Sequence, residues 1–311
     1  MHNKLLHKTA RVLKAIDEHQ ALGLEELYLL LGLPKPTLKR LLDDLEEMGW
    51  LYRRLGDKRY VSLSNIHGPG DSRYHLAKEA HPFLDQLFES TGLASDLVIA
   101  TASGPSILES NFSRLGIRTG RDRLIGARPC PLHAASGRAL CAHQLLNGSS
   151  SWLAPGFRDN QLRDNQPQDN PLRDSQLRQL ADEYRDGYFR RLSGNWEYGF
   201  RFPFKIDAIA IALSIKQRTM ASLNLYWDKQ RFTYKTVEKR YLSRLEAIGQ
   251  QLMPVLERHV ATLETLSQRD LLPGPGMPAS AAFQPAFSQS TGDVAASTAR
   301  PVRRHAQSSE P

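Results

Sequence analysis

The sequence predicts an α+β protein with a small amino-terminal unit of helices and one hairpin, followed by a larger unit in which antiparallel strands and helices both occur. Residues 4–66 contain three apolar stripes at helical spacing and then two short strand-like runs. Residues 206–226 contain two strand-like runs around a turn, with helical stripes at residues 76–88 and 242–260 on either side in the sequence. A chain of 311 residues is long enough for about two globular units.

Composition and charge narrow the class of protein. Hydrophobic residues make up 41% of the chain, which is enough for real cores and excludes a wholly disordered protein. The formal net charge of +8 is compatible with an anionic partner without proving one. Cys130 and Cys141 are the two cysteines of the sequence, so a disulfide scaffold is excluded and a reducing compartment is expected. Apolar runs stay well short of the roughly 18 residues of a membrane helix, and the first residues resemble no secretion signal, so we expect a cytoplasmic protein without a membrane partner.

Residues 4–49 predict three helices joined by short turns. The first spans residues 4–18, and the second, residues 25–31, ends at Gly32, a residue type that tolerates the left-handed backbone of a helix terminus. The third begins around Pro36, whose missing N–H costs nothing in a first turn. Its inward stripe consists of Leu38, Leu41, Leu42, Leu45 and Met48. A short helix, a tight corner and a second helix with an apolar inner stripe form a helix-turn-helix.

The outer surface of the third helix changes charge along its length. Its first turns carry Lys35, Thr37, Lys39 and Arg40. The later turns carry Asp43, Asp44, Glu46 and Glu47. This polarity suits a reading helix, because the amino-terminal turns enter the major groove and the helix dipole attracts phosphate there. We therefore expect Lys35, Thr37 and Arg40 to contact base edges and Lys39 to contact phosphate.

A basic hairpin follows the third helix. Two strand-like runs at residues 51–55 and 59–63 flank a Gly-Asp-Lys turn. The hairpin carries the cations Arg53, Arg54, Lys58 and Arg59, which we expect to lie over the phosphate backbone. The alternative is an interaction module of three helices and a hairpin whose basic face is simply solvated. The charge distribution of helix and hairpin together favours double-stranded DNA as the partner.

The second unit is predicted from patterns further along the chain. An apolar stripe from Leu76 to Phe88 predicts a linker helix within residues 67–90. Strands are expected at residues 97–100, 206–215 and 221–227. A long helix with a stripe over residues 242–260 comes next, and Pro254 should kink it.

Two segments have compositions that do not suggest a core. Residues 158–179 repeat an Arg-Asp-Asn/Ser-Gln pattern and are interpreted as an expanded surface loop. Residues 269–311 are dominated by Pro, Ala, Ser, Gly and Gln and are expected to form a disordered tail. The folded domains are then residues 4–66 and 91–268.

The helix-turn-helix resembles that of IclR-family transcriptional regulators. The resemblance is carried by residues 32–42 (Gly-Leu-Pro-Lys-Pro-Thr-Leu-Lys-Arg-Leu-Leu) and by residues 45–51 (Leu-Glu-Glu-Met-Gly-Trp-Leu). Residues 131–140 resemble the loop and helix of the family's effector domain, and the likeness covers roughly residues 5–262. Ala221–Leu225 is similar to the branch that includes activators of phenylpropionate catabolism.

The resemblance implies a function. Such proteins have a winged helix-turn-helix and a GAF-like effector domain, an antiparallel sheet flanked by helices. They bind promoter DNA as homodimers or tetramers, with the linker helix in the dimer contacts, and they respond to small organic acids, including aromatic ones. The alternative is a small-molecule-binding enzyme or sensor module with a basic interaction domain.

The resemblance also implies which residues bind the effector. They are Ala135, Ser136, Glu197, Asp207, Asn224 and Tyr226. The family often has a cysteine at Asp207, which argues against an unmodified carboxylate-binding chemistry. The residues themselves support part of this set, because N–H groups at the helix start after Ser136 suit a carboxylate and alternate residues Asn224 and Tyr226 share a strand face. The alternative is that Asn224 and Tyr226 are satisfied sheet residues facing solvent.

Metal, cofactor and catalytic sites are not expected. Cys130, His133, Cys141 and His143 have donor types suited to zinc, but the i, i+2 spacing of the second pair on a helix points its members apart. The sequence contains no phosphate-binding loop, dinucleotide fingerprint or nucleophile elbow, so an enzyme is not expected either.

Overall fold

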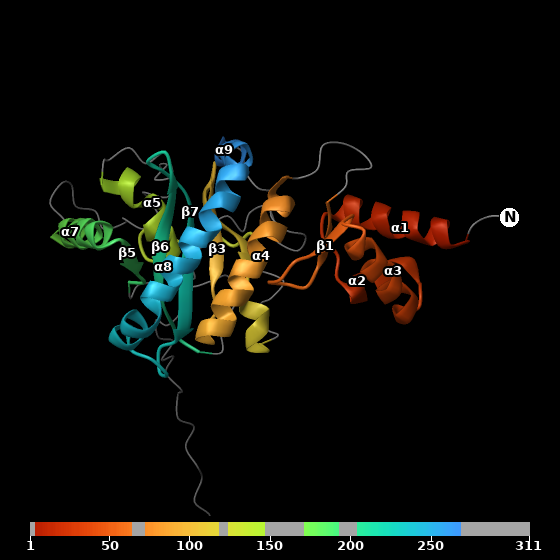
Figure 1. Ribbon diagram of the computed structural model, residues 1–311, viewed down its shortest axis with the longest axis horizontal. Helices are drawn as coiled ribbons and strands as arrows, with labels where there is room; N and C mark the ends of the chain where they lie inside the picture. The colour runs from red at the N-terminus through yellow and green to blue at the C-terminus, as the bar shows by residue number, and fades with distance from the viewer. Residues whose placement is uncertain (1–3, 64–71, 118–123, 147–170, 193–203, 269–311) are drawn as a thin grey trace, which may run out of the picture.

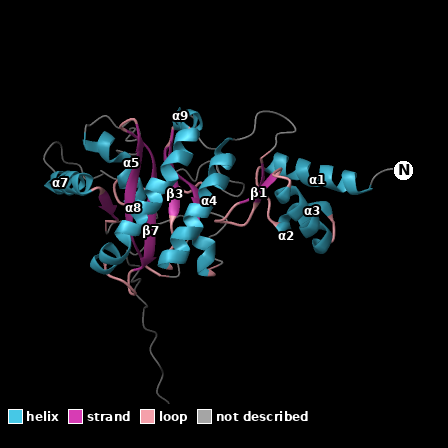
Figure 2. Ribbon diagram, viewed as in Figure 1, coloured by secondary structure: helices cyan, strands magenta, loops and turns pink. Residues whose placement is uncertain are grey.

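The protein forms an elongated molecule with a small helical unit at one end and a larger sheet-containing unit at the other (Figure 1). The computed structural model describes residues 4–63, 72–117, 124–146, 171–192 and 204–268. Figure 2 shows helices gathered at the amino-terminal end and the long strands in the second unit. The predicted α+β class, with a helix-turn-helix before an antiparallel sheet flanked by helices, is confirmed.

The amino-terminal unit has three helices and a two-stranded hairpin. The elements are α1 (Lys4–His19), α2 (Leu24–Leu31), α3 (Lys35–Glu47), β1 (Leu51–Arg53) and β2 (Tyr60–Ser62). α2 ends at Gly32 in the left-handed conformation (φ 64°), and its N–H donates to the Tyr28 carbonyl. Pro36 lies in the first turn of α3, where no intrahelical donor is lost. Val12 and Ile16 of α1 pack with Leu38 and Leu42 of α3 in one buried cluster. This packing holds α1 and α3 against each other.

The second unit is built on one antiparallel sheet in the order β4-β3-β7-β6-β5. The strands are β3 (Asp96–Thr101), β4 (Gly104–Ser110), β5 (Tyr188–Arg190), β6 (Ile206–Ile215) and β7 (Arg218–Asp228). The helices are α4 (Ser72–Thr91), η1 (Phe112–Leu115), α5 (Ala135–Leu146), α7 (Pro171–Asp186), α8 (Tyr234–Arg258) and α9 (Val260–Gln268). The helices α4, α8 and α9 cover one face of the sheet, and α5 covers the other. We call these the α8 face and the α5 face.

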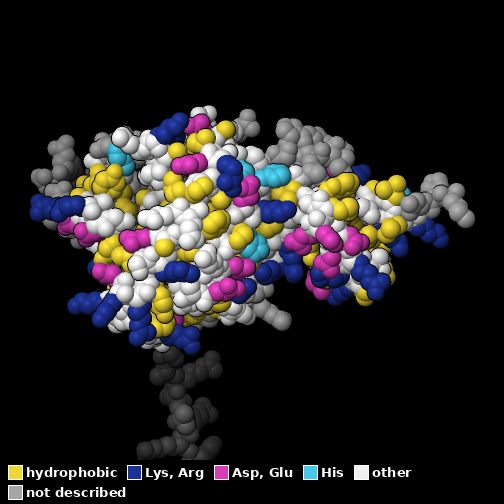
Figure 3. Space-filling model, viewed as in Figure 1, with side chains coloured by type: hydrophobic (Ala, Val, Ile, Leu, Met, Phe, Trp, Pro, Cys, Tyr) yellow, Lys and Arg dark blue, Asp and Glu magenta, His cyan; other side chains and the backbone are white. Residues whose placement is uncertain are grey.

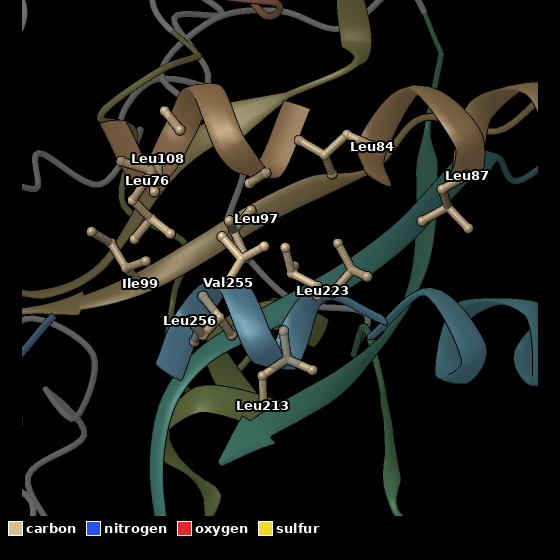
Figure 4. Close-up of a cluster of buried hydrophobic side chains, with 14 of the residues drawn as sticks. Leu76, Leu84, Leu87, Leu97, Ile99, Leu108, Leu213, Leu223, Val255 and Leu256 are labelled. Atoms are coloured by element: carbon tan, nitrogen blue, oxygen red, sulfur yellow. The ribbon is translucent and has the colours of Figure 1, made fainter. Parts of the chain in front are cut away.

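Side-chain size on β6 explains this two-sided packing. Ile209, Ile211 and Leu213 belong to the cluster on the α8 face, whereas the alternate residues Ala208 and Ala210 belong to the cluster on the α5 face. Figure 4 shows leucine and valine side chains from α4, α8 and the strands meeting on the α8 face. The small residues on the other side allow α5 to lie close to the sheet.

One prediction about regular structure needs correction. Residues 171–179 were expected in a loop, but they form the first turns of α7, which extends from Pro171 to Asp186. Among the residues of α7 whose side chains are described, only Leu180 and Glu183 are buried, so the helix has almost no apolar stripe to reveal it. α8 continues through Pro254 to Arg258 as one helix, because buried Val255 and Leu256 hold that turn in the core, and the kink expected at Pro254 stays a prediction. The rest of the expected loop, residues 158–170, and the expected tail, residues 269–311, lie outside the described residues.

Candidate nucleic-acid interface and effector site

The first turns of α3 present polar side chains to solvent. Lys35, Lys39 and Arg40 are exposed and Thr37 is half-buried. The leucines of the same helix turn inward: Leu38, Leu41, Leu42 and Leu45 are all buried. The structure thus places the predicted reading residues on the outer face of α3. Basic and acidic side chains both occur on this view of the amino-terminal unit (Figure 3).

The cations of α3 differ in their local partners. Lys35 Nζ lies 2.7 Å from Glu25 Oε2 on α2 and over the Tyr28 ring. Lys39 pairs with Asp43 one turn later, and this hydrogen bond raises the pKa of Lys39. Among the described residues, Arg40 forms neither an ion pair nor a side-chain hydrogen bond. An exposed guanidinium without an internal partner is the cation of α3 most readily offered to a base edge or a phosphate.

One cation of the hairpin, Arg54, is buried and not exposed as predicted. Arg54 is buried at 7% exposure and pairs with Asp57 in the turn, with 3.0 Å between its Nε and Oδ1. It therefore does not reach a phosphate. The expectation that every hairpin cation faces DNA is wrong at Arg54 because the turn packs against the second unit, where Ser113 Oγ donates to the Leu55 carbonyl at 2.6 Å.

The other hairpin cations are half-buried. Arg53 lies over the Tyr60 ring at 5.5 Å, and its Nε donates to the Lys58 carbonyl. Arg59 Nη2 lies 2.5 Å from Glu26 Oε1, so it ties the hairpin to α2. Lys58 has a left-handed backbone with φ 62°. These residues remain at the surface but are oriented by partners within the unit.

The α5 face of the sheet brings together four of the six predicted effector residues. Ala135 and Ser136 form the buried first turn of α5, and Ser222 Oγ on β7 donates to the Ser136 carbonyl at 2.9 Å. Asn224 and Tyr226 follow Ser222 at alternate positions and so lie on the same side of β7. The start of α5 and these two side chains therefore occupy one side of the sheet.

Asn224 has a specific partner that the sequence did not reveal. Its Oδ1 accepts from the Asp96 backbone N–H at 2.6 Å, and its Nδ2 donates to Asp96 Oδ2 at 3.2 Å. Asn224 is 3% and Tyr226 2% exposed, so the alternative in which both face solvent is wrong. The Tyr226 ring stacks with Phe112 at a centroid distance of 6.5 Å. In the sequence, Asp96 is a single acidic residue at the start of an apolar strand. Nothing in the sequence indicates that its partner is Asn224.

Asp207 and Glu197 are not placed with this group. Asp207 belongs to the series Asp207, Ile209 and Ile211 on the α8 face of β6, and Tyr234 OH donates to its Oδ1 at 3.3 Å. Burial, together with Asp207, raises the pKa of Tyr234. The effector role predicted for Asp207 is contradicted by its position on the opposite side of the sheet from Asn224. Glu197 lies outside the described residues.

A buried ion pair supports the start of α5. Arg138 is 2% exposed and donates through Nε to Glu183 Oε2 on α7 at 3.2 Å, and its Nη2 donates to the same oxygen. Its Nη1 also donates to the Leu132 carbonyl at 3.2 Å, so one guanidinium connects α5, α7 and the loop before α5. Gly137 lies so close to this loop that an added Cβ would be 2.3 Å from the Cys130 carbonyl oxygen. The sequence does not reveal this pair, because a charged residue among the small residues of α5 is its single local sign.

The cysteine and histidine residues near α5 do not assemble a metal site within the described part of the chain. Cys130 Sγ lies 3.4 Å from His133 Nδ1. Burial raises the pKa of the Cys141 thiol well above its ordinary value, so it stays protonated. Desolvation, with a contribution from Arg138, lowers the pKa of His133. In the described ranges, the helices are all too short or too polar to cross a lipid bilayer.

Three solved structures are similar to this chain at low sequence identity. An IclR family transcriptional regulator from Brucella abortus is 20% identical, with a TM-score of 0.44, over 80% of this chain and 91% of that one. An IclR homolog from Microbacterium hydrocarbonoxydans, complexed with 4-hydroxybenzoate, is 19% identical over 82% of this chain and 100% of that one, with a TM-score of 0.40. The inducer-binding domain of PobR from Acinetobacter, a double mutant in complex with 3-hydroxybenzoic acid, is 18% identical over 58% of this chain and 98% of that one, with a TM-score of 0.44.

At the level of domain families, the match falls on the amino-terminal unit. Residues 5–55 match the IclR helix-turn-helix domain, a range that begins in α1 and ends just beyond β1. This range contains the corner at Gly32 and the exposed first turns of α3 described above. Residues 5–55 therefore fold as a helix-turn-helix and are similar to the IclR helix-turn-helix domain.

Proposed function

We propose that this protein is an IclR-family transcriptional regulator that binds promoter DNA and responds to a small organic acid. The observation that carries the proposal is the exposed Arg40, next to Thr37, on the first turns of α3 in an IclR-type helix-turn-helix. Arg, with its planar fork of donors, is suited to guanine edges, and Thr suits either polar or methyl contacts in the major groove. Lys35 would read bases beside them, and Lys39, Arg53, Lys58 and Arg59 would contact phosphates.

We infer that the DNA-binding form is a cytoplasmic homodimer. A single α3 covers only a few base pairs, and two copies related by two-fold symmetry would cover two half-sites. A dimer of this kind predicts a palindromic operator, with half-sites about one helical turn apart.

The effector proposal rests on the α5 face. The backbone N–H groups at the start of α5, with Ala135 and Ser136, would bind a carboxylate, since a helix start favours an anion. Tyr226 and Phe112 offer stacked rings on the same side of the sheet, which suits an aromatic acid. Aromatic acids of the hydroxybenzoate and phenylpropionate types are therefore the first probes, and turnover of such an acid by the purified protein would favour an enzyme instead.

The DNA-reading role of α3 is tested by substituting Arg40. Duplexes selected from a random pool by the wild-type protein serve as the operator, and binding to them is compared with binding to unselected duplex. Arg40→Ala should lower the preference for selected duplex by about 1–3 kcal/mol, the usual discrimination of one bidentate base contact.

The matched control is Arg240→Ala, which removes the same charge from an exposed position on α8. It should leave the preference unchanged. If Arg40→Ala discriminates between the two kinds of duplex as well as wild type does, Arg40 does not read bases and the proposal loses its main support.

A further inference from the structure

A carboxylate of the second unit is buried against the hairpin of the helix-turn-helix. Glu109, on β4, is fully buried and accepts four hydrogen bonds. Its Oε2 accepts from Tyr52 OH at 2.5 Å and from the Leu55 N–H at 3.1 Å. Its Oε1 accepts from the N–H groups of Gly56 and Ser110, both at 2.9 Å. Three of these four donors belong to the hairpin, so one side chain of β4 holds both β1 and the hairpin turn.

A β-bulge directs Glu109 toward the hairpin. Leu97 on β3 pairs with Glu109, while the next residue, Val98, pairs with Ile107, so Leu108 is an extra residue in β4. Cross-strand partners share a face, so Glu109 lies on the same side as Leu97, the α8 face. Without the extra residue, Glu109 would follow Ile107 to the α5 face. The bulge is thus what brings the carboxylate to the hairpin.

The hairpin turn is held from a second direction as well. Ser113 Oγ on η1 donates to the Leu55 carbonyl at 2.6 Å, so the second unit binds both backbone polar groups of Leu55. Gly56 is closely packed, because an added Cβ would be 2.7 Å from Ile125 Cδ1 and 3.3 Å from the Ser110 carbonyl oxygen. In this arrangement Leu55 and Gly56 of the hairpin turn are enclosed by the second unit.

The same short segment also reaches the predicted effector residues. Phe112, between the two hairpin contacts in sequence, lies on the α5 face and stacks with Tyr226 at an interplanar angle of 23°. Asn111 Nδ2 donates to the Leu84 carbonyl of α4 at 2.8 Å, and its Oδ1 accepts from the Ser95 N–H at 2.7 Å. Residues 109–113 therefore contact the hairpin, the linker helix α4 and the predicted effector side of the sheet within five consecutive positions.

We propose that residues 109–113 couple the effector side of the sheet to the hairpin, with Glu109 and Ser113 as the positioning residues that hold or release the hairpin turn. The identity of the coupled sites rests on the proposed function. A ligand beside Tyr226 would displace Phe112, and Phe112 would shift its neighbours in the segment and so loosen the turn. Such a ligand must bind the held and released arrangements with different affinities, since only that difference shifts their populations.

The balance of forces at Glu109 makes release of the turn feasible. Burial is the largest influence on this carboxyl and raises its pKa in spite of the hydrogen bonds from Tyr52, Ser110, Leu55 and Gly56. The ionised carboxylate is therefore less stable in the interface than its many donors suggest. A clamp of this kind combines a specific geometry with a charged group whose burial costs free energy.

The clamp is tested by hydrogen exchange of the full chain, read at the Leu55 and Gly56 amides by mass spectrometry. In Glu109→Gln, whichever way the new amide lies, its NH₂ group faces a backbone N–H where an oxygen now accepts. Exchange at these amides should become at least about tenfold faster, as expected for losing a hydrogen bond to a charged group, while β6 and β7 exchange as before. The control Glu257→Gln changes an exposed carboxylate on α8 and should have no effect.

Coupling is tested by Phe112→Leu against Phe189→Leu, which makes the same change at another buried phenylalanine of the α5-face cluster. At matched global stability, Phe112→Leu should speed exchange at Leu55 and Gly56 several-fold more than Phe189→Leu. Equal effects of the two variants would overturn the coupling, and unchanged exchange in Glu109→Gln would overturn the clamp. Neither measurement uses DNA or an effector, so failure here is distinct from failure of the Arg40 experiment.

Discussion

Individual buried polar side chains organise the second unit. Asn224 is satisfied by Asp96, Arg138 by Glu183, and Glu109 by donors of the hairpin. Each of these groups would be costly in an apolar interior without its partner, because an unpaired buried charge cannot recover its lost hydration. These pairs therefore help to fix how separate segments of the chain meet.

At the residue scale, removing one partner of the buried ion pair should destabilise the protein strongly. In Glu183→Ala, Arg138 stays enclosed among α5, α7 and the loop at Leu132 without its carboxylate. We expect a loss of about 3–5 kcal/mol in the free energy of unfolding, measured by urea denaturation. Asp182→Ala, which removes an exposed carboxylate paired with Arg185 on the same helix, should cost less than about 1 kcal/mol. Similar losses for the two variants would show that the pair is not effectively buried.

At the scale of elements, packing decides where helices continue. α8 continues past Pro254 because Leu252, Val255 and Leu256 are buried on the sheet around it. The packing of these side chains outweighs the missing N–H and the steric clash of the proline ring. Packing is also why α7 exists in a segment whose composition predicts a loop, since Leu180 and the Glu183–Arg138 contact attach it to α5.

The cost of Pro254 can be measured. Its ring is exposed on α8, so Pro254→Ala restores a backbone donor and a better helix former without creating a cavity. We expect the free energy of unfolding to rise by about 1–3 kcal/mol in urea denaturation. A lower stability than wild type would mean that Pro254 favours the packing of the helix on the sheet.

At the scale of the whole molecule, the two units are joined by the hairpin as well as by the chain. Tyr52, Leu55, Val61 and Leu63 of the amino-terminal unit belong to the same buried cluster as α4, α8 and the sheet. The side chains Lys35, Lys39 and Arg40 of α3 stay exposed. The position of this proposed DNA-reading surface relative to the sheet is therefore set by a polar and apolar interface around Glu109.

This interface should depend on pH in a defined direction. Burial raises the pKa of Glu109, so the held hairpin binds a proton more tightly than the released one does. The contribution of Glu109 to the stability of the held hairpin is full below the ordinary glutamate pKa of about 4.3. This contribution is lost as the pH rises through the raised pKa of Glu109. Protection of the Leu55 and Gly56 amides, corrected for intrinsic exchange, should then fall with rising pH in wild type but not in Glu109→Gln.

Comparing wild type with Glu109→Gln separates the titration of Glu109 from that of its neighbours. Tyr52, Arg54 with Asp57, and His81 surround the carboxyl or its partner and are all retained in Glu109→Gln. Any pH dependence that they cause appears in both proteins and cancels in the difference. The prediction is wrong if the difference in amide protection between wild type and Glu109→Gln stays constant or increases as the pH rises.

The sequence by itself determined the local elements of this protein. The helix-turn-helix, the polarity of α3, the β6–β7 hairpin and the apolar stripe of α8 were all predictable, because each is recorded in the spacing of neighbouring residues. The shared side of Asn224 and Tyr226 followed from the same alternation.

Only the tertiary structure decided which side chains those elements bring together. Burial of Arg54, the position of Asp207 on the α8 face, and the Asp96–Asn224 and Arg138–Glu183 pairs depend on register and on contacts between residues far apart in the chain. In β4, a β-bulge places the Glu109 side chain on the α8 face instead of the α5 face. Such contacts leave no periodic trace in the sequence, since they join residues that meet only when separate elements pack together.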